Sequence, residues 1–247
     1  ANQLQAGIDL YIAKHGDEVA GKKIEIIKKD TGGPAADVAQ RMAQELVVRD
    51  GADIIAGFAL TPEALGAAPV ADEAQKLMVV MNAATSIVTE QSPYIVRTSV
   101  TIPQVNYAFG KWAYEQGIRE AYTLVADYGP GIDAEASFAK GFTEMGGTIV
   151  GADRTPVANP DFSAYVQRVA DAAPEAVYIF VPGGAQPAAI GKALVDRGLA
   201  PPDTKVLGQG ELTHPEALES MGETARGIFT TFHYTLERDD PLNKAYV

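Results

Sequence analysis

Apolar and polar positions alternate along the chain with two periods, and each period predicts a different kind of element. Leu4, Ile8 and Ile12 recur every four residues, which places them on one face of a helix that opens the chain. Uninterrupted apolar runs at 77–81 and 176–181 are typical of strands that are buried on both faces of a sheet. Because helical and strand patterns follow each other regularly, they predict an α/β protein.

The order of these elements also predicts the direction of the strands. Strands are expected at 24–27, 53–57, 77–81, 122–126, 148–151 and 176–181, with an extended segment at 95–99 and short strands near Val206 and Ile228. Helices are expected at 63–75, 132–145 and 186–197, and around apolar stripes that contain Met42, Phe109 and Val166. Since the crossover between two parallel strands is right-handed and long enough to hold a helix, this order predicts parallel sheets with helices on both faces. Ligands bind such sheets beyond the carboxyl ends of the strands.

The pattern runs through two similar Rossmann-like lobes. We expect lobe 1 at 1–99, lobe 2 at 100–230, and a return segment at 231–247 that leads back towards the hinge and lobe 1. The crossings between the lobes are short, which favours a hinge over a free linker. A lobe of this kind normally begins with a strand, whereas this chain opens on a helix and stops at 244–247 within another helical pattern. We therefore expect that both ends are truncated and that the first strand of lobe 1 is missing.

Composition and charge narrow the function. The chain is 47% hydrophobic and 21% charged, which suits a globular protein with a sizeable core. The formal net charge of −12 argues against nucleic acid or an anionic membrane as partner, because the long-range field would repel both. No stretch approaches the roughly 20 consecutive apolar residues of a membrane span, and no signal-peptide pattern is present.

Signatures of enzymes and metal sites are scarce. The chain has no cysteine, which excludes disulfides and thiolate chemistry, and its three histidines are not paired at metal-ligand spacing. Neither a GxSxG motif nor a Walker loop occurs, and the glycines at 129–131 and 208–210 do not complete a G-x-G-x-x-G spacing. We therefore expect no enzyme activity, no metal and no cofactor.

Two turns in lobe 1 join apolar strands to helices through small or hydroxylated residues, at 57–62 and 81–86. Such turns expose backbone N–H groups and hydroxyls, which suits a carboxylate that docks at a helix N-terminus. For Thr61 alone, ordinary N-capping before a proline is an equal alternative. The occurrence of two such turns in one lobe favours a ligand cradle.

The corresponding strand ends of lobe 2 lie at 127–131, 181–184 and 208–211. Tyr128 offers a flat apolar wall with one polar tip, or else it packs as a partly buried tyrosine. Glu211 is able to accept a hydrogen bond from a ligand hydroxyl or ammonium, or else it is an exposed loop carboxylate. Arg97, near the hinge, is a candidate partner for a ligand carboxylate, with a structural ion pair as the alternative.

Several motifs together resemble one family of transport proteins. They are Gly-Lys-Lys-Ile-Glu-Ile at 21–26 with Asp30, Ile-Ala-Gly at 55–57, Ala-Ala-Pro-Val-Ala-Asp-Glu at 67–73, Asn-Ala-Ala-Thr-Ser at 82–86, Asp-Tyr-Gly at 127–129 and Asn-Pro-Asp-Phe at 159–162. They span essentially the whole chain, which resembles the type I periplasmic solute-binding proteins of ABC importers, in the branched-chain amino-acid-binding family. The resemblance implies the type I periplasmic binding protein fold, a cleaved export signal, periplasmic residence and docking to a membrane permease. We expect a monomer.

The resemblance also implies a ligand site. Thr61 and the 83–85 turn would hold a carboxylate, while Tyr128 would supply an aromatic wall and Glu211 an acidic group. Pro182 stands where an aromatic residue is common, a departure that speaks against an amino acid. The whole expected site consists of Phe58, Ala59, Leu60, Thr61, Ala83, Ala84, Thr85, Tyr128, Pro182, Gly183, Gln209 and Glu211.

The runs at 94–98, 127–131 and 208–211 resemble members that bind aromatic acids such as hydroxybenzoates. We therefore expect a small aromatic carboxylate, captured by hinge closure, with a branched-chain amino acid or an amide as the alternative. Two other classes stay open. One is an enzyme of flavodoxin-like or Rossmann-like architecture, which the missing nucleotide loop disfavours, and the other is the ligand-binding domain of a receptor or sensor.

Overall fold

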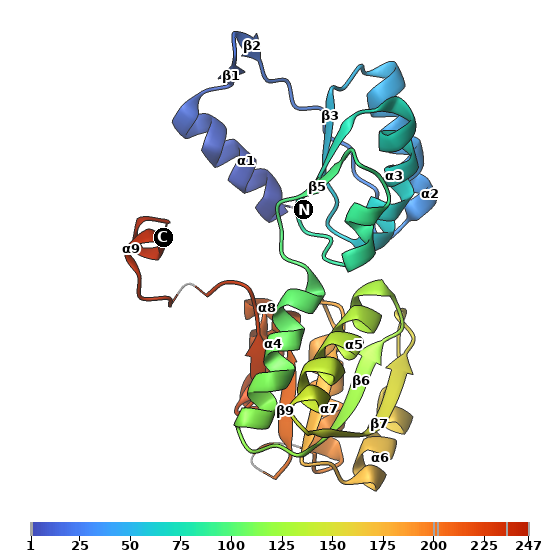
Figure 1. Cartoon of the computed structure of the whole chain (residues 1–247), viewed down its shortest axis with the longest axis vertical. Helices are drawn as coiled ribbons and strands as arrows, with labels where there is room; N and C mark the ends of the chain where they lie inside the picture. Colours follow the sequence, from blue (N-terminus) through green and yellow to red (C-terminus); the bar gives the residue numbers. More distant parts are fainter. Residues whose placement is uncertain (1, 200, 202, 236, 247) are drawn as a thin grey trace. The chain divides into compact units, whose positions relative to one another are not determined.

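The computed structural model describes residues 2–199, 201, 203–235 and 237–246, and it divides the chain into two compact units (Figure 1). Unit 1 is Ala1–Thr101 and unit 2 is Ile102–Val247. Each unit contains a parallel sheet with helices packed on it, so the predicted α/β class with parallel sheets is confirmed. The predicted return of 231–247 towards lobe 1 stays a prediction.

The sheet of unit 1 consists of three parallel strands in sequential order, β3 (Ile54–Gly57), β4 (Leu77–Val80) and β5 (Ile95–Arg97). The helical elements of this part are α2 (Ala36–Gln44), a π-helical turn (Glu45–Arg49), α3 (Thr61–Ala74) and a 3-10 turn (Ser86–Glu90). Helices α2 and α3 pack closely, because Gly66 has no side chain: a Cβ there would lie 2.2 Å from the Ala36 carbonyl oxygen. Buried Ile55, Met78 and Val80 join the alanines of α3 in one core.

The first part of unit 1 differs from the expected pattern. Helix α1 (Asn2–His15) leads into a short antiparallel hairpin of β1 (Glu18–Val19) and β2 (Lys22–Lys23). The strand predicted at 24–27 is wrong, since this segment is irregular. A strand needs a neighbour that completes its ladder of hydrogen bonds, and among the described residues no strand pairs with 24–27. Its isoleucines are accordingly 38–40% exposed.

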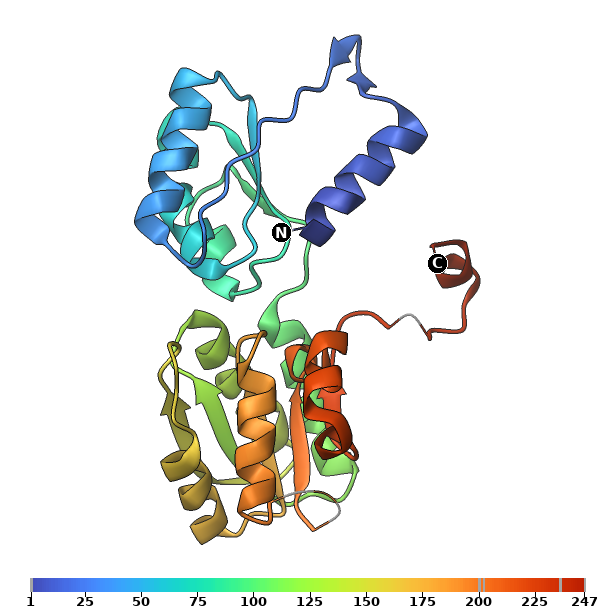
Figure 2. The same cartoon turned by 180° about the vertical axis from the view of Figure 1, so that it is seen from behind.

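Within the described residues, unit 2 has a five-stranded parallel sheet in the order β10-β9-β8-β6-β7. The strands are β6 (Glu120–Ala126), β7 (Thr148–Thr155), β8 (Ala176–Phe180), β9 (Lys205–Gln209) and β10 (Phe229–Thr231). Helices α4 (Ile102–Glu115) and α5 (Gly129–Glu144) cover one face (Figure 1), and α6 (Ser163–Ala172) and α7 (Gln186–Asp196) cover the other (Figure 2). Shorter helices follow at Gly210–Thr213, α8 (Pro215–Met221), Gly222–Ala225 and α9 (Pro241–Tyr246).

The strand order of unit 2 determines where a ligand is able to bind. After β6 the chain moves to one side to form β7, and then it crosses to the other side to form β8. The connections that follow β6 and β8 therefore leave the sheet in opposite directions, which creates a topological switch point at the carboxyl ends of these strands. Tyr178 of β8 stacks on Phe138 of α5 with ring centroids 4.1 Å apart, and both side chains are fully buried. The residues after β8 therefore follow a strand that is packed tightly against α5.

Candidate functional site

In unit 1 the turns that follow β3 and β4 are hydrogen-bonded to each other. Gly57 and Phe58 both have positive φ angles, 121° and 64°, and this turns the chain sharply away from β3. The carbonyl oxygen of Gly57 then accepts from the Met81 amide at 2.8 Å, and that of Phe58 accepts from the Ala83 amide at 2.9 Å. The Asn82 side chain adds a third bond, in which its amide donates to the Ala59 carbonyl at 2.8 Å. The two predicted turns therefore form one surface.

Two threonine hydroxyls meet on this surface. The Oγ1 atoms of Thr61 and Thr85 lie 2.6 Å apart, and each residue is only 4% exposed. Because each hydroxyl has a single proton, the pair uses one proton internally and keeps the other for a further acceptor. The sequence places Thr61 and Thr85 in separate turns, and the structure brings their side chains together.

The N-terminus of α3 is capped by a glutamate rather than by Thr61. The Leu60 amide donates to Oε2 of Glu63 at 3.0 Å, and the Thr31 hydroxyl donates to Oε1 of the same carboxylate. Thr61 is already the first residue of the helix, and its hydroxyl makes no capping bond. The N-capping interpretation of Thr61 therefore does not apply, and its hydroxyl remains with Thr85 on the turn surface.

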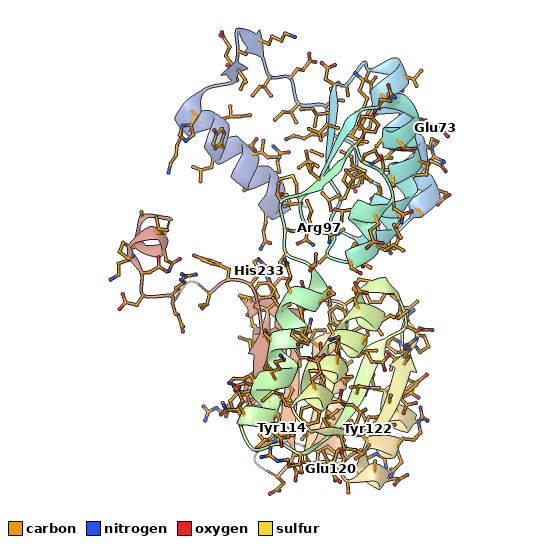
Figure 3. All side chains as sticks on the ribbon, viewed as in Figure 1. Glu73, Arg97, Tyr114, Glu120, Tyr122 and His233 are labelled. Carbon is orange, nitrogen blue, oxygen red and sulfur yellow. The ribbon has the colours of Figure 1, made fainter. Side chains whose placement is uncertain are left out.

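The turn at 83–85 presents hydrogen-bond donors. Arg97 binds its carbonyl groups, with Nη1 donating to the Ala83 oxygen at 2.9 Å and Nη2 donating to the Thr85 oxygen at 2.7 Å. The amides of Ala84 and Thr85 donate to no acceptor in the described part of the chain. Figure 3 shows Arg97 at the end of β5, the strand next to β4. In these two contacts the partners of Arg97 are backbone carbonyls, and the ion pair considered for it stays a prediction.

In unit 2 the predicted residues gather around the ends of β6, β8 and β9. Tyr128 precedes the first residue of α5, and its ring lies 6.2 Å from that of Phe180. Burial first, and then the Glu211 carboxylate, raise the pKa of Tyr128 well above its ordinary value. A Cβ at Gly183 would lie 3.2 Å from Oε2 of Glu211, so the glycine turn leaves this carboxylate room.

The position of Glu211 is fixed by its neighbour. Its backbone amide donates to Oε1 of Gln209 at 3.0 Å, and Gln209 is only 6% exposed. Glu211 itself is half-buried, as are Tyr128 and Pro182. Unit 2 thus has an aromatic ring after β6 and a carboxylate after β9, and the glycine turn at 183–184 follows β8, the strand between them. This is suited to accept a hydrogen bond from a ligand beside an apolar wall.

Three residues of these surfaces were not among the expected site residues. Asn82 and Glu63 hold the unit 1 turns through side chain to backbone bonds, and Phe180 supports the Tyr128 ring. Glu63 lies three residues after Leu60, which is the spacing of a capping carboxylate, so its capping role could have been predicted from the sequence. Asn82 lies inside a predicted turn, and its position there also made it a candidate. Of the expected residues, Phe58 and Ala59 are half-buried and Leu60 is 37% exposed.

The described residues contain neither a helix that could cross a membrane nor a side-chain cluster that could hold a metal ion. None of their helices combines the length and apolar character that crossing a bilayer requires. Within the same residues, no group of three or more histidine or carboxylate side chains is placed to hold a metal ion.

The similarity of the chain to known proteins is extensive. Residues 1–247 match the family model described as periplasmic binding protein. The chain is 42% identical over 245 residues to the Leu/Ile/Val-binding protein homolog 6 of Brucella melitensis biotype 1 and to that of Brucella abortus strain 2308. These matches cover 98% of this chain, which spans 62% of the length of each curated relative.

Solved structures match equally well. A solute binding protein of an ABC transporter from Rhodopseudomonas palustris BisB5, in complex with 3,4-dihydroxy benzoic acid, has a TM-score of 0.90 at 47% identity, over 100% of this chain and 67% of that one. Another from R. palustris, in complex with 4-hydroxybenzoate, has a TM-score of 0.93 at 39% identity, over 99% of this chain and 67% of that one. The predicted type I periplasmic binding protein fold is confirmed. This chain belongs to the periplasmic binding protein family.

Proposed function

We propose that this chain is part of the solute-binding component of an ABC importer and that it captures a small aromatic carboxylate of the hydroxybenzoate type. One observation carries the proposal: in unit 1, the Thr61 and Thr85 hydroxyls and the amides of Ala84 and Thr85 form a surface of donors. A carboxylate is a pure acceptor, and hydrogen bonds from neutral donors to a charged acceptor are stronger than those between neutral groups. No reaction is proposed at this site.

The donor surface is suited to a carboxylate but does not distinguish one acid from another. Selection would fall to unit 2, where the half-buried Tyr128 ring provides an apolar wall and Glu211 an acceptor. A phenolic hydroxyl needs one acceptor, which Glu211 supplies. A ring hydroxyl bound to Glu211 and a carboxylate bound to unit 1 would give the ligand differential affinity for a closed state, which is what hinge closure requires.

The similar proteins support this choice. The two R. palustris proteins bind 3,4-dihydroxybenzoate and 4-hydroxybenzoate, at 47% and 39% identity to this chain. The names of the Brucella relatives instead favour leucine, isoleucine or valine, which would place an ammonium near Glu211. A branched-chain amino acid is therefore the second candidate. For either ligand we propose periplasmic location, a monomeric state and a membrane permease as partner.

Calorimetry on the purified full-length protein with 4-hydroxybenzoate, benzoate and leucine separates the two candidates. We expect tight binding of 4-hydroxybenzoate, weaker binding of benzoate and no measurable binding of leucine. Glu211→Gln should weaken 4-hydroxybenzoate more than benzoate, because a neutral amide is a poorer acceptor for the ring hydroxyl. Glu219→Gln, at an exposed position of α8, is the matched control. Tight leucine binding without benzoate binding would overturn the assignment.

A further inference from the structure

Arg97 is placed to act on the donor surface of unit 1 without being part of it. It is the last residue of β5, paired in register with Val80, the last residue of β4. The Thr98 amide donates to the Val80 carbonyl at 3.0 Å, which continues the pairing past the end of both strands. The backbone of Arg97 is therefore fixed relative to the turn that begins one residue after Val80. From there its half-buried side chain reaches the carbonyls of Ala83 and Thr85.

The contact with Ala83 determines the orientation of the next amide. A trans peptide is planar, so its C=O and N–H groups point in opposite directions. The Ala83 carbonyl accepts from Arg97 Nη1, and the N–H of the same peptide group, which belongs to Ala84, must therefore point away from the guanidinium. That N–H donates to no acceptor in the described part of the chain, so it is available to a ligand.

A second pair of contacts fixes the rest of the turn. The Ala83 amide donates to the Phe58 carbonyl at 2.9 Å, and the Thr85 carbonyl accepts from Arg97 Nη2 at 2.7 Å. The Thr85 side chain is meanwhile held by the Thr61 hydroxyl at 2.6 Å. The turn is thus held from three sides, and among the described residues Arg97 is the side chain that binds both the Ala83 and the Thr85 carbonyl. A guanidinium has a rigid fork of donors that suits this task, whereas the ammonium of lysine is a single point.

We propose that Arg97 is a positioning residue for carboxylate capture: it orients the 83–85 turn so that the Ala84 amide and the Thr85 hydroxyl face the ligand, and it does not touch the ligand itself. This inference rests on the proposed function. The terminal nitrogens of Arg97 that point at the turn are occupied by backbone oxygens, which distinguishes this role from a direct ion pair with the ligand. The two roles predict different effects of Arg97→Lys.

The test compares Arg97→Lys and Arg97→Gln with the wild type in the full-length protein, using 4-hydroxybenzoate as the probe. At metal sites, removal of a residue that orients a metal ligand typically lowers the affinity about 10- to 100-fold. We expect a loss of affinity of this order for both Arg97 variants. Arg41→Gln removes the same charge from an exposed position of α2 and should stay close to wild type. If Arg97→Gln does not fold, Arg97→Lys still decides, because it keeps the charge and loses only the fork.

Amide NMR supplies a readout that affinity does not. In the wild type the Ala84 amide signal should move downfield when 4-hydroxybenzoate binds, and at saturation this shift should be clearly smaller in both Arg97 variants. A direct ion pair would instead let Arg97→Lys bind like wild type with an unchanged Ala84 shift, and that result overturns the inference alone. Equal affinity of all variants overturns it too. Failure of the wild type itself to bind any benzoate overturns the proposed function, and the inference with it.

Discussion

The hydroxyl pair in unit 1 allows a test of the site that needs no ligand. Thr61 and Thr85 are 24 residues apart in sequence, and their Oγ1 atoms lie 2.6 Å apart in a region where each residue is 4% exposed. Valine has nearly the shape of threonine but lacks the hydroxyl. Thr61→Val, Thr85→Val and the double variant therefore remove the hydroxyls with little change in shape.

The magnitudes follow from the burial of both groups. Either single substitution leaves the remaining hydroxyl of the pair without its partner, which costs about 1–3 kcal/mol in the free energy of unfolding. The double variant leaves no hydroxyl unpartnered, so it loses the hydrogen bond but avoids the penalty for a buried unsatisfied group. It should be less destabilised than the sum of the two singles, with a coupling energy of about 1 kcal/mol or more.

Urea unfolding followed by two probes measures these terms. The chain has a single tryptophan, Trp112, and it belongs to α4 of unit 2, so its fluorescence reports that unit while far-UV circular dichroism reports both. The Thr61 and Thr85 variants should change the dichroism transition. The control is the second hydroxyl pair, Thr213 and Thr230, whose Oγ1 atoms lie 2.7 Å apart in unit 2. Valine at these two positions should shift the fluorescence transition.

Additive losses of stability would contradict the hydrogen bond between the two threonines. If the double variant at Thr61 and Thr85 lost as much stability as the two singles combined, the hydroxyls would not share a hydrogen bond, and the donor surface would lack its central feature. A double variant more stable than either single would support the pair most directly. The same double variant should bind 4-hydroxybenzoate more weakly than the wild type, because the remaining hydroxyl proton is then absent.

Three further predictions concern unit 2. Phe138→Ala removes a fully buried ring that stacks on Tyr178, and should lower the free energy of unfolding by about 3–5 kcal/mol in urea. Burial and Asp153 raise the pKa of Tyr122 to about 12. The stabilising contribution of this hydroxyl is therefore complete below about pH 10 and is lost as the pH rises through 12. Tyr122→Phe should flatten this part of the curve of unfolding free energy against pH. Gly131→Ala places a Cβ 1.9 Å from the Ala126 carbonyl oxygen, and should weaken 4-hydroxybenzoate binding in calorimetry by displacing the start of α5.

The regular alternation of the sequence was enough to predict most elements, because apolar periodicity reports burial directly. The run predicted as a strand at 77–81 is β4 (Leu77–Val80), and the helix predicted at 63–75 is α3 (Thr61–Ala74). The helix predicted at 132–145 begins earlier, at Gly129. Its first turn contains two glycines, which lower helix propensity, yet Gly131 is required there because the Ala126 carbonyl approaches so closely. This close approach of two backbone segments only five residues apart explains why a glycine stands in the first turn of the helix.

The chemistry of the unit 1 turns was less accessible. Small and hydroxylated residues at strand ends predicted both turns, but the contact between Thr61 and Thr85 depends on the register of β3 and β4, in which Gly57 pairs with Val80. Nor does a sequence indicate which backbone carbonyls a guanidinium will bind, because every residue has one. For this reason Arg97 was predicted to pair with a charged group. Its contacts with the backbone carbonyls of Ala83 and Thr85 were not predictable from the residues around it in the sequence.

Under the proposed function, the two units place different demands on a ligand. The donors of unit 1 suit any carboxylate, whether it belongs to an amino acid or to a benzoate. An α-ammonium that leaves water needs a negative partner and further acceptors, since a buried charge without them costs several kcal/mol. A phenolic hydroxyl needs a single acceptor beside an apolar wall. In unit 2, the Glu211 carboxylate is close enough to Tyr128 to raise the pKa of its hydroxyl, and the Glu211 backbone amide donates to the Gln209 side chain. Under the proposed function, one carboxylate beside a ring meets the demand of the phenol more fully than that of the ammonium, so Glu211 is the residue whose substitution tests the choice between the two ligand classes.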